Sequence, residues 1–259
     1  DFVARTRKEY ETVRIQHGRK KPRTPPVSLA TARANALALD WEDYTPPVPH
    51  RLGISEVSAN IETLRHYIDW TPFFMTWSLA GKYPRILEDE VVGVEAKRLF
   101  ADANAMLDEL SAKQALTPRG VVGIFPANRV GDDIHIYRDE ARRDVLQVSH
   151  HLRQQTEKTD FANYCLADFV APAASRKADY LGAFAVTGGL EEDSLAEAYD
   201  AAHDDYNKIM VKALADRLAE AFAEYLHERV RKVIWGFAPT ENLSNEELIR
   251  ENYQGIRPA

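Results

Sequence analysis

The sequence predicts an α+β fold, in which an antiparallel or mixed sheet is flanked by long helices and preceded by a helical arm. Residues 120–126 form a short apolar run, and a turn at Val130–Asp133 separates this run from the alternating residues 134–137. This pattern is typical of a β-hairpin. Helical periodicity occupies residues 95–116 and 195–226. Strands joined by a hairpin and flanked by long helices favour α+β over a doubly wound sheet.

The composition is that of a globular protein. The 259 residues are 45% hydrophobic and 28% charged, and no run approaches the roughly 18 apolar residues of a membrane-spanning helix. The first residues lack the pattern of a secretory signal. The single cysteine, Cys165, excludes an internal disulfide framework and is typical of a reducing compartment. We therefore expect a cytoplasmic protein without a membrane partner.

The N-terminal part is basic and the remainder is acidic. Residues 1–33 carry nine lysines and arginines against three acidic residues, although the whole chain has a net charge of −7. The acidic body would repel phosphates, and no aromatic residues interleave the basic cluster, so nucleic acid is not an expected partner. The basic arm instead suits an acidic neighbouring domain or the body itself.

The arm and the body contain a series of predicted elements. Residues 3–16 predict a polar helix, the proline-rich stretch 18–26 a linker, and Ser28 the cap of a helix that ends near Leu39. Within the body, helices are expected over residues 60–67, 95–116 and 195–226, the last with a break near 203–206. Strands are expected over residues 120–126, 134–137, 165–171 and 180–186.

Common catalytic and cofactor motifs are absent from the sequence. There is no dinucleotide or phosphate-binding glycine loop and no Cys-x-x-Cys pair. Gly188-Gly189 precedes acidic residues, which would repel a phosphate, so a structural loop is favoured there. His150 and His151 are adjacent rather than spaced for one helix face, and no metal site is expected. Cys165 begins an apolar run and is interpreted as a packed thiol.

Two groups of residues could bind a ligand. Asp69 lies among tryptophans and phenylalanines, where a carboxylate either caps a helix or binds a ligand in an apolar pocket. Arg217 and Glu220 lie at the edge of the apolar stripe of the long helix. They form either an i,i+3 ion pair or a cation and a carboxylate that meet an amino-acid zwitterion at a cleft.

Several long segments of the sequence resemble those of one family, the C-terminal activation domain of cobalamin-dependent methionine synthase, most closely the bacterial form. These segments lie in a fixed order at Tyr67–Phe74, Gly120–Arg129 with Asp132–Ile134, Cys165–Val170, Asp179–Phe184, Asp205–Glu220 and Tyr253–Ala259. The resemblance implies that residues 27–259 form the activation domain and that residues 1–26 are a basic linker from the cobalamin-binding domain. It also implies a C-terminal truncation, because further residues follow Arg-Pro-Ala in the family.

The resemblance implies a function in reactivating a methyltransferase. In this family the domain binds S-adenosylmethionine, and the sulfonium methyl group converts inactive cob(II)alamin to methylcobalamin with an electron from a flavodoxin-type protein. The parent enzyme methylates homocysteine with methyltetrahydrofolate on other domains, which also hold the cobalamin. The domain is therefore not expected to be catalytic alone.

The resemblance also places ligand contacts. The family's S-adenosylmethionine contacts correspond to Asp69, Arg257 and the backbone of Ala259 in this sequence. The resemblance also implies that Arg217 and Glu220 line the same cleft. Asp69 would bind the ligand's amino group and Arg257 its carboxylate, while the aromatic neighbours of Asp69 would offer faces to the adenine or sulfonium. The alternative is a non-catalytic acidic docking module for a redox partner or neighbouring domain.

Overall fold

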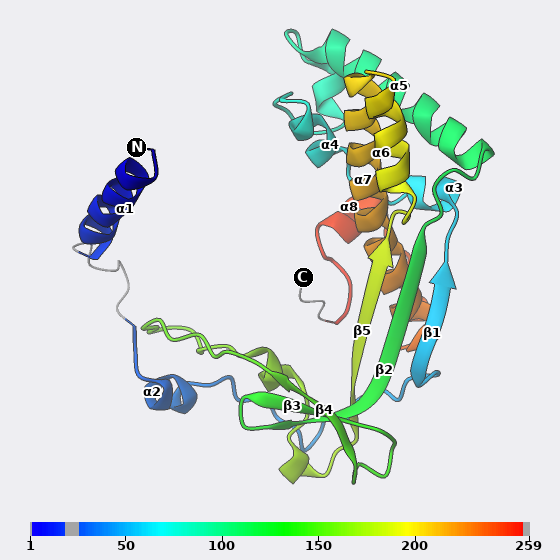
Figure 1. Cartoon of the computed structure of the whole chain (residues 1–259). Helices are drawn as coiled ribbons and strands as arrows, with labels where there is room; N and C mark the ends of the chain where they lie inside the picture. The colour runs from blue at the N-terminus through cyan, green and yellow to red at the C-terminus, as the bar shows by residue number, and fades with distance from the viewer. Residues whose placement is uncertain (1, 19–25, 256–259) are drawn as a thin grey trace. The chain divides into compact units, whose positions relative to one another are not determined.

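The predicted α+β class is confirmed by the computed structural model, which describes residues 2–18 and 26–255. The helices are α1 (Phe2–Gly18), α2 (Leu29–Ala34), α3 (Ile61–Arg65), α4 (Trp70–Thr76), α5 (Gly93–Ala112), α6 (Glu192–Ala201), α7 (Asp205–Arg229) and α8 (Asn245–Ile249). The strands are β1 (Gly53–Ser58), β2 (Arg119–Val130), β3 (Asp133–Tyr137), β4 (Val145–His150) and β5 (Asp179–Thr187). Figure 1 shows these elements, coloured along the chain from the N-terminus to the C-terminus.

The five strands form one sheet in the order β1-β2-β3-β4, with β5 paired to β2. β1 runs antiparallel to the first half of β2, with Gly53 opposite Ile124. The second half of β2 forms the predicted hairpin with β3, and β4 continues it antiparallel to β3. The residues form two compact units, of which the first comprises Asp1–Pro46 and Pro126–Leu181 and the second Pro47–Phe125 and Gly182–Ala259.

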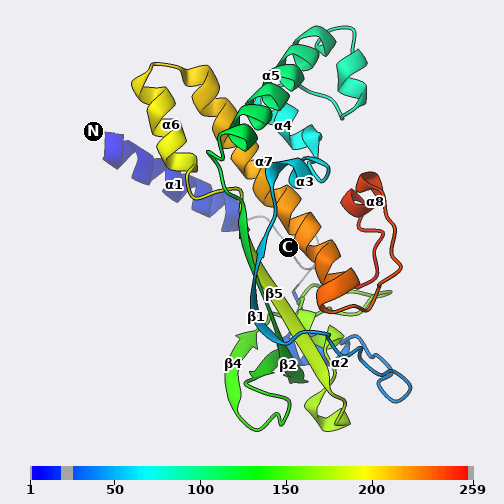
Figure 2. The same ribbon diagram turned by 90° about the vertical axis from the view of Figure 1, so that its right-hand side faces the viewer.

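The second unit is built around helix α7. Helices α3, α4, α5 and α6 all pack on α7 (Figure 2). Buried residues recur along it at three- and four-residue intervals, among them Met210, Leu214, Leu218 and Phe222. This spacing places them on one face of the helix, which therefore faces the core. The Asp204 side chain caps the helix by accepting a hydrogen bond from the backbone N of Asn207 at 3.0 Å.

The predicted break in the long helical run is confirmed between α6 and α7. His203 adopts a positive φ of 56°, which ends α6, and α7 starts at Asp205. The Gly188-Gly189 loop before α6 is structural, because a Cβ on Gly188 would lie 2.3 Å from the carbonyl oxygen of Ala215 on α7. Glycine is needed for this close approach of two backbones.

Some boundaries differ from the predictions. Residues 165–171 do not form a strand: Leu166–Phe169 is a 3-10 turn, η2, whose Asp168 side chain accepts a hydrogen bond from the backbone N of Cys165 at 3.0 Å. An aspartate that caps its own turn favours a bend over an extended chain. Helix α2 starts after Ser28 as predicted but already ends at Ala34.

The N-terminal arm matches the prediction only where the structure describes it. Helix α1 is confirmed, and none of its described residues is buried. Most of the predicted linker, residues 19–25, lies outside the described residues, and the boundary near residue 26 stays a prediction. No helix in the described ranges has the length and apolar character needed to cross a bilayer.

Candidate functional site

Asp69 lies at the start of α4 and is half-buried. Its Oδ1 atom accepts a hydrogen bond from the backbone N of Thr71 at 2.9 Å, so the carboxylate caps this helix. Among the described residues, the bond from Thr71 is the one hydrogen bond that the Asp69 side chain makes. A carboxylate has four lone-pair positions, so Oδ2 can still accept a donor from a ligand. The capping role and a binding role are therefore compatible.

The two residues before Asp69 form hydrogen bonds to α7 and to α8. The Tyr67 hydroxyl donates to Glu228 Oε2 of α7 at 2.6 Å, and its ring meets Tyr225 edge-on at 5.5 Å. Ile68 is buried, and its carbonyl accepts a long hydrogen bond from Asn245 Nδ2 at 3.4 Å. Asn245 belongs to α8 and is 177 positions away in the chain. The fold thus brings the C-terminal part of the chain next to Asp69.

In the hydrogen bond between Tyr67 and Glu228, the glutamate carries a negative charge and the tyrosine is neutral. Burial opposes ionisation of Glu228, but hydrogen bonds from Tyr67 and Lys232 outweigh it and hold the pKa of Glu228 below its ordinary value. Burial, followed by the hydrogen bond to Glu228, raises the pKa of Tyr67 well above its ordinary value. Tyr67 is therefore a neutral donor at neutral pH, and this hydrogen bond is charge-assisted.

A cavity of about 480 Å³ opens beside this junction. Its lining comes from α3, the end of α7 and the C-terminal part of the chain: Asn60, Glu62, Thr63, His66, Tyr67, Glu228, Leu243, Asn245 and Leu248. The lining is mainly polar and contains two carboxylates. Asp69, Arg217 and Glu220 are not part of it.

The aromatic residues around Asp69 are core residues. Trp70, Phe73 and Phe74 are 6%, 0% and 0% exposed, and their rings pack against one another and against Phe100 of α5. The expectation that they offer open faces to a ligand is therefore wrong for these three rings, because neighbouring side chains cover them. Their contribution is to anchor α4 and, with it, Asp69.

Arg217 and Glu220 lie on α7, which packs against α4. The predicted i,i+3 pair between them does not form, since Arg217 instead binds Asp216, with 2.5 Å between Nη2 and Oδ2. The Arg217 side chain is only 15% exposed, whereas Glu220 is exposed. Across the described residues, no hydrogen bond or ion pair joins Asp69 to Arg217 or Glu220. The packing of α4 on α7 brings their helices together, but not their side chains.

The remaining two predicted contacts, Arg257 and Ala259, lie outside the described residues. In the sequence they follow α8 and Tyr253. The Tyr253 ring packs edge-on against the ring of His227 near the end of α7, with 4.8 Å between the ring centroids. Their role as ligand contacts stays a prediction.

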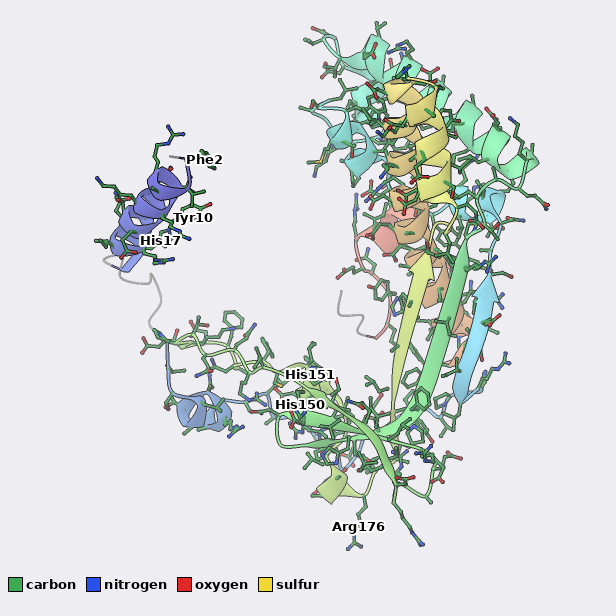
Figure 3. The ribbon with its side chains drawn as sticks, in the orientation of Figure 1. Phe2, Tyr10, His17, His150, His151 and Arg176 are labelled. Carbon is green, nitrogen blue, oxygen red and sulfur yellow. The ribbon has the colours of Figure 1, made fainter. Side chains whose placement is uncertain are left out.

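The other candidate side chains have structural surroundings. His150 and His151 lie side by side at the end of β4 (Figure 3), where His150 pairs with Asp133 at 3.1 Å and His151 contacts Ser149 at 3.0 Å. In the described ranges no three histidine, cysteine, aspartate or glutamate side chains are grouped to hold a metal ion. Cys165 is 2% exposed, and burial raises the pKa of its thiol. It is the packed thiol that the sequence predicts.

Sequence reasoning missed the contacts of Tyr67 with Glu228 and of Asn245 with Ile68. Neither pair is visible as a local pattern, because each joins distant parts of the chain. One signal was available for α8: Ser244 and Glu247 form a capping box, with Ser244 N to Glu247 Oε2 at 2.8 Å. A serine followed three residues later by glutamate marks a helix start.

Two comparisons with known proteins agree. The chain matches a family model described as the activation domain of vitamin B12 dependent methionine synthase over residues 60–259. It is also similar to the crystal structure of the MetH reactivation domain bound to AdoHcy, with 82% sequence identity and a TM-score of 0.90. The match covers 91% of this chain and 73% of that chain.

Proposed function

This chain belongs to the family of activation domains of vitamin B12-dependent methionine synthases, and from that premise we propose that it binds S-adenosylmethionine as a methyl donor. The parent enzyme is a methyltransferase, of which this chain is the reactivation domain. The proposed ligand contacts are Asp69, Arg217, Glu220, Arg257 and the backbone of Ala259. The AdoHcy bound by the similar reactivation domain is the product that remains when S-adenosylmethionine loses its methyl group.

One observation carries this proposal: α8 is fixed against the residue that precedes Asp69. The hydrogen bond from Asn245 to the Ile68 carbonyl joins the C-terminal part of the chain to the start of α4. Because the two groups of proposed contacts are far apart in sequence, such a junction is needed for both to reach one small ligand. Asp69 would accept the ligand's ammonium group on Oδ2, and Arg257 would pair with its carboxylate.

The chemistry asks little of the side chains. A sulfonium is an activated methyl donor, so the domain has to bind and orient it rather than supply an acid or base. The other substrate is cob(II)alamin on a neighbouring domain, which becomes a methyl acceptor only after one-electron reduction to cob(I)alamin. The sulfonium methyl group, together with one electron from a flavodoxin-type donor, converts it to methylcobalamin and leaves S-adenosylhomocysteine.

The partners in this proposal are the cobalamin-binding domain of the same enzyme and a flavodoxin-type protein, in the cytoplasm. The basic residues of α1 and the acidic balance of the remainder support electrostatic docking between domains. The domain alone would bind the methyl donor without turning over.

The test is the substitution Asp69→Asn with calorimetric titration of S-adenosylmethionine. Asparagine caps a helix about as well as aspartate, so the fold should be retained. Losing the charge on an ion-paired hydrogen bond should weaken binding by about tenfold or more. Asp204→Asn is the matched control, because it changes the cap of α7 in the same way away from the proposed contacts.

Unchanged affinity in Asp69→Asn would reject Asp69 as a ligand contact. If the folded wild-type chain bound no S-adenosylmethionine, the ligand proposal itself would fail. A non-catalytic docking module would then be the better description.

A further inference from the structure

A fully buried arginine lies just beyond the end of α7. Arg231 is 0% exposed and belongs to a turn of π-helix, η4 (Val230–Ile234), that continues α7. Its Nε atom donates to both carboxylate oxygens of Glu241, at 2.8 and 3.1 Å, and its Nη2 atom also donates to Glu241. Its Nη1 atom donates to Nδ1 of His227 at 2.7 Å, so His227 accepts in this contact. Removing a charge from water is costly unless it is paired this completely.

The partners of Arg231 tie down the residues that follow it. Residues 237–255 are here called the C-terminal segment. The Tyr253 ring lies over the Arg231 guanidinium, with 4.4 Å from Cζ to the ring centroid. Near the start of the segment, the backbone N of Ala238 donates to the Arg231 carbonyl at 2.9 Å. Arg231 therefore contacts the segment at its beginning, at Glu241 and at Tyr253.

The segment has little regular structure of its own to hold it in place. Its helix, α8, is five residues long, and Leu248 is the one residue of α8 that is buried. An isolated helix of this length is unstable in water. The position of the segment therefore depends on its contacts with the rest of the unit, and those to Arg231 involve a fully buried charged side chain.

We propose that Arg231, Glu241 and Tyr253 are positioning residues for S-adenosylmethionine binding. The inference rests on the proposed function, because it takes Arg257 and Ala259 as ligand contacts. Arg257 comes four positions after Tyr253 in the sequence, and four extended residues span at most about 14 Å. When Tyr253 is fixed at the end of α7, the chain at position 257 can therefore reach only a limited distance from that end of the helix. None of the three residues needs to touch the ligand.

The effect on binding follows from a population argument. When the ligand binds only molecules whose segment is in place, the apparent dissociation constant rises in proportion to the loss of that population. Glu241→Gln leaves Arg231 buried without its counter-charge. The least costly relief is for the segment to leave α7, because α7 itself is held by the core of the unit.

The experiment compares the wild type with two variants by calorimetric titration of S-adenosylmethionine. Glu241→Gln should weaken binding by roughly tenfold or more. The double variant Arg231→Met with Glu241→Leu replaces the buried pair by apolar side chains of similar size, which often hold a structure equally well. It should restore the affinity to within about threefold of the wild type.

Hydrogen exchange of the C-terminal segment supplies a second readout, which needs no ligand. Glu241→Gln should accelerate exchange in residues 237–255, and the double variant should reverse this. Leu107→Ala is the control for general destabilisation, since Leu107 is a 0% exposed residue of α5 that does not belong to the segment. It should lower the stability of the unit without changing the affinity while the protein stays folded.

Three outcomes would overturn the inference. They are wild-type affinity in Glu241→Gln, weak binding by a double variant whose segment is protected from hydrogen exchange, and a loss of affinity in Leu107→Ala as large as that in Glu241→Gln. The second would mean that Arg231 or Glu241 contacts the ligand directly. A failure of the proposed function is separate and visible first, because the wild type itself would then not bind. The exchange data would still test whether Arg231 holds the segment.

Discussion

The two units of the molecule are stabilised by different means. In the second unit, aromatic and aliphatic side chains of α4, α5 and α7 are buried together, with Phe73, Leu107 and Leu214 each 0% exposed. In the first unit the apolar cluster is small, consisting of Ala127, Ile134, Cys165, Ala167 and Val170. Hydrophobic burial alone supplies much less there.

A buried ionic network supports the first unit. Arg153 donates through Nη1 and Nη2 to Asp168, at 2.8 and 2.7 Å, and through Nη2 and Nε to Asp132, at 2.7 and 2.9 Å. The Arg153 and Asp168 side chains are 2% and 0% exposed. Arg129 adds a second cation on Asp168 at 2.9 Å, and Arg33 of the short helix α2 reaches Asp132 at 2.7 Å. Charges thus connect parts of this unit that few apolar contacts join.

The difference teaches that the two units should fail under different conditions. An apolar core is sensitive to lost volume, whereas a buried ionic network is sensitive to the loss of one partner and to acid. The site proposed for the ligand lies in the second unit, so the two failures should also differ in their effect on binding.

The largest effect is expected from Arg153→Met in the first unit. Removing this cation leaves the buried Asp168 and the partly buried Asp132 with fewer partners, which costs about 3–5 kcal/mol of unfolding free energy. Chemical denaturation measures the loss, and hydrogen exchange should assign it to residues 126–181. An exchange increase of equal size in α5 and α7 would show that the two units do not fail separately.

A somewhat smaller effect is expected from Leu214→Ala in the second unit. Leu214 is 0% exposed on the core face of α7, and the cavity left behind costs about 2–5 kcal/mol. Chemical denaturation measures this loss, and hydrogen exchange of the residues in the ionic network should be unchanged in this variant.

A surface ion pair provides the contrast. The exposed Lys113 pairs with Glu109 of α5 at 2.6 Å, and Lys113→Gln should change the free energy of unfolding by less than about 0.5 kcal/mol.

An effect smaller than that of Arg153→Met or Leu214→Ala is expected from mild acid. Burial opposes ionisation of Asp168 and Asp132, but hydrogen bonds from their arginines outweigh it and keep the pKa of each carboxyl below its ordinary value. A depressed pKa contributes stability above the unfolded value, near 4, and this contribution is lost as pH falls through the folded pKa. The first unit should therefore begin to open below about pH 4.

Asp179 opposes this trend in the same unit. Burial raises the pKa of Asp179, despite hydrogen bonds from the backbone N atoms of Ala171 and Tyr180. Its cost is present at neutral pH and is relieved as the pH falls, so it reduces the acid loss. Exchange measured between pH 7 and pH 3, corrected for the intrinsic rate, should rise earlier in residues 126–181 than in α7. A simultaneous rise would contradict the contrast between the units.

Local patterns in the sequence were enough to predict most helices. The three- and four-residue spacing of buried residues in α5 and α7, the caps Ser28 and Asp69, and the break near His203 all act over a few residues. The hairpin of β2 and β3 is local in the same sense. The elements missed were β1, β4 and α8, which are short and carry weak periodicity.

The error at residues 165–171 has a specific cause. A short apolar run does not distinguish a strand from a compact turn. Asp168 decides in favour of the turn, because its carboxylate accepts hydrogen bonds from the backbone N of Cys165 and from Arg153. Arg153 is not adjacent to this run in sequence. No local reading of the apolar run could include it.

The sequence by itself determined the α+β class, the principal helices and the family, because these depend on local periodicity and on segments in a fixed order. It also singled out Asp69 as a capping or binding carboxylate. Only the tertiary structure decided that Asn245 binds the Ile68 carbonyl and that Arg231 is buried against Glu241. The physical reason is that a hydrogen bond or ion pair depends on the distance between two groups, and folding brings together groups that the chain separates.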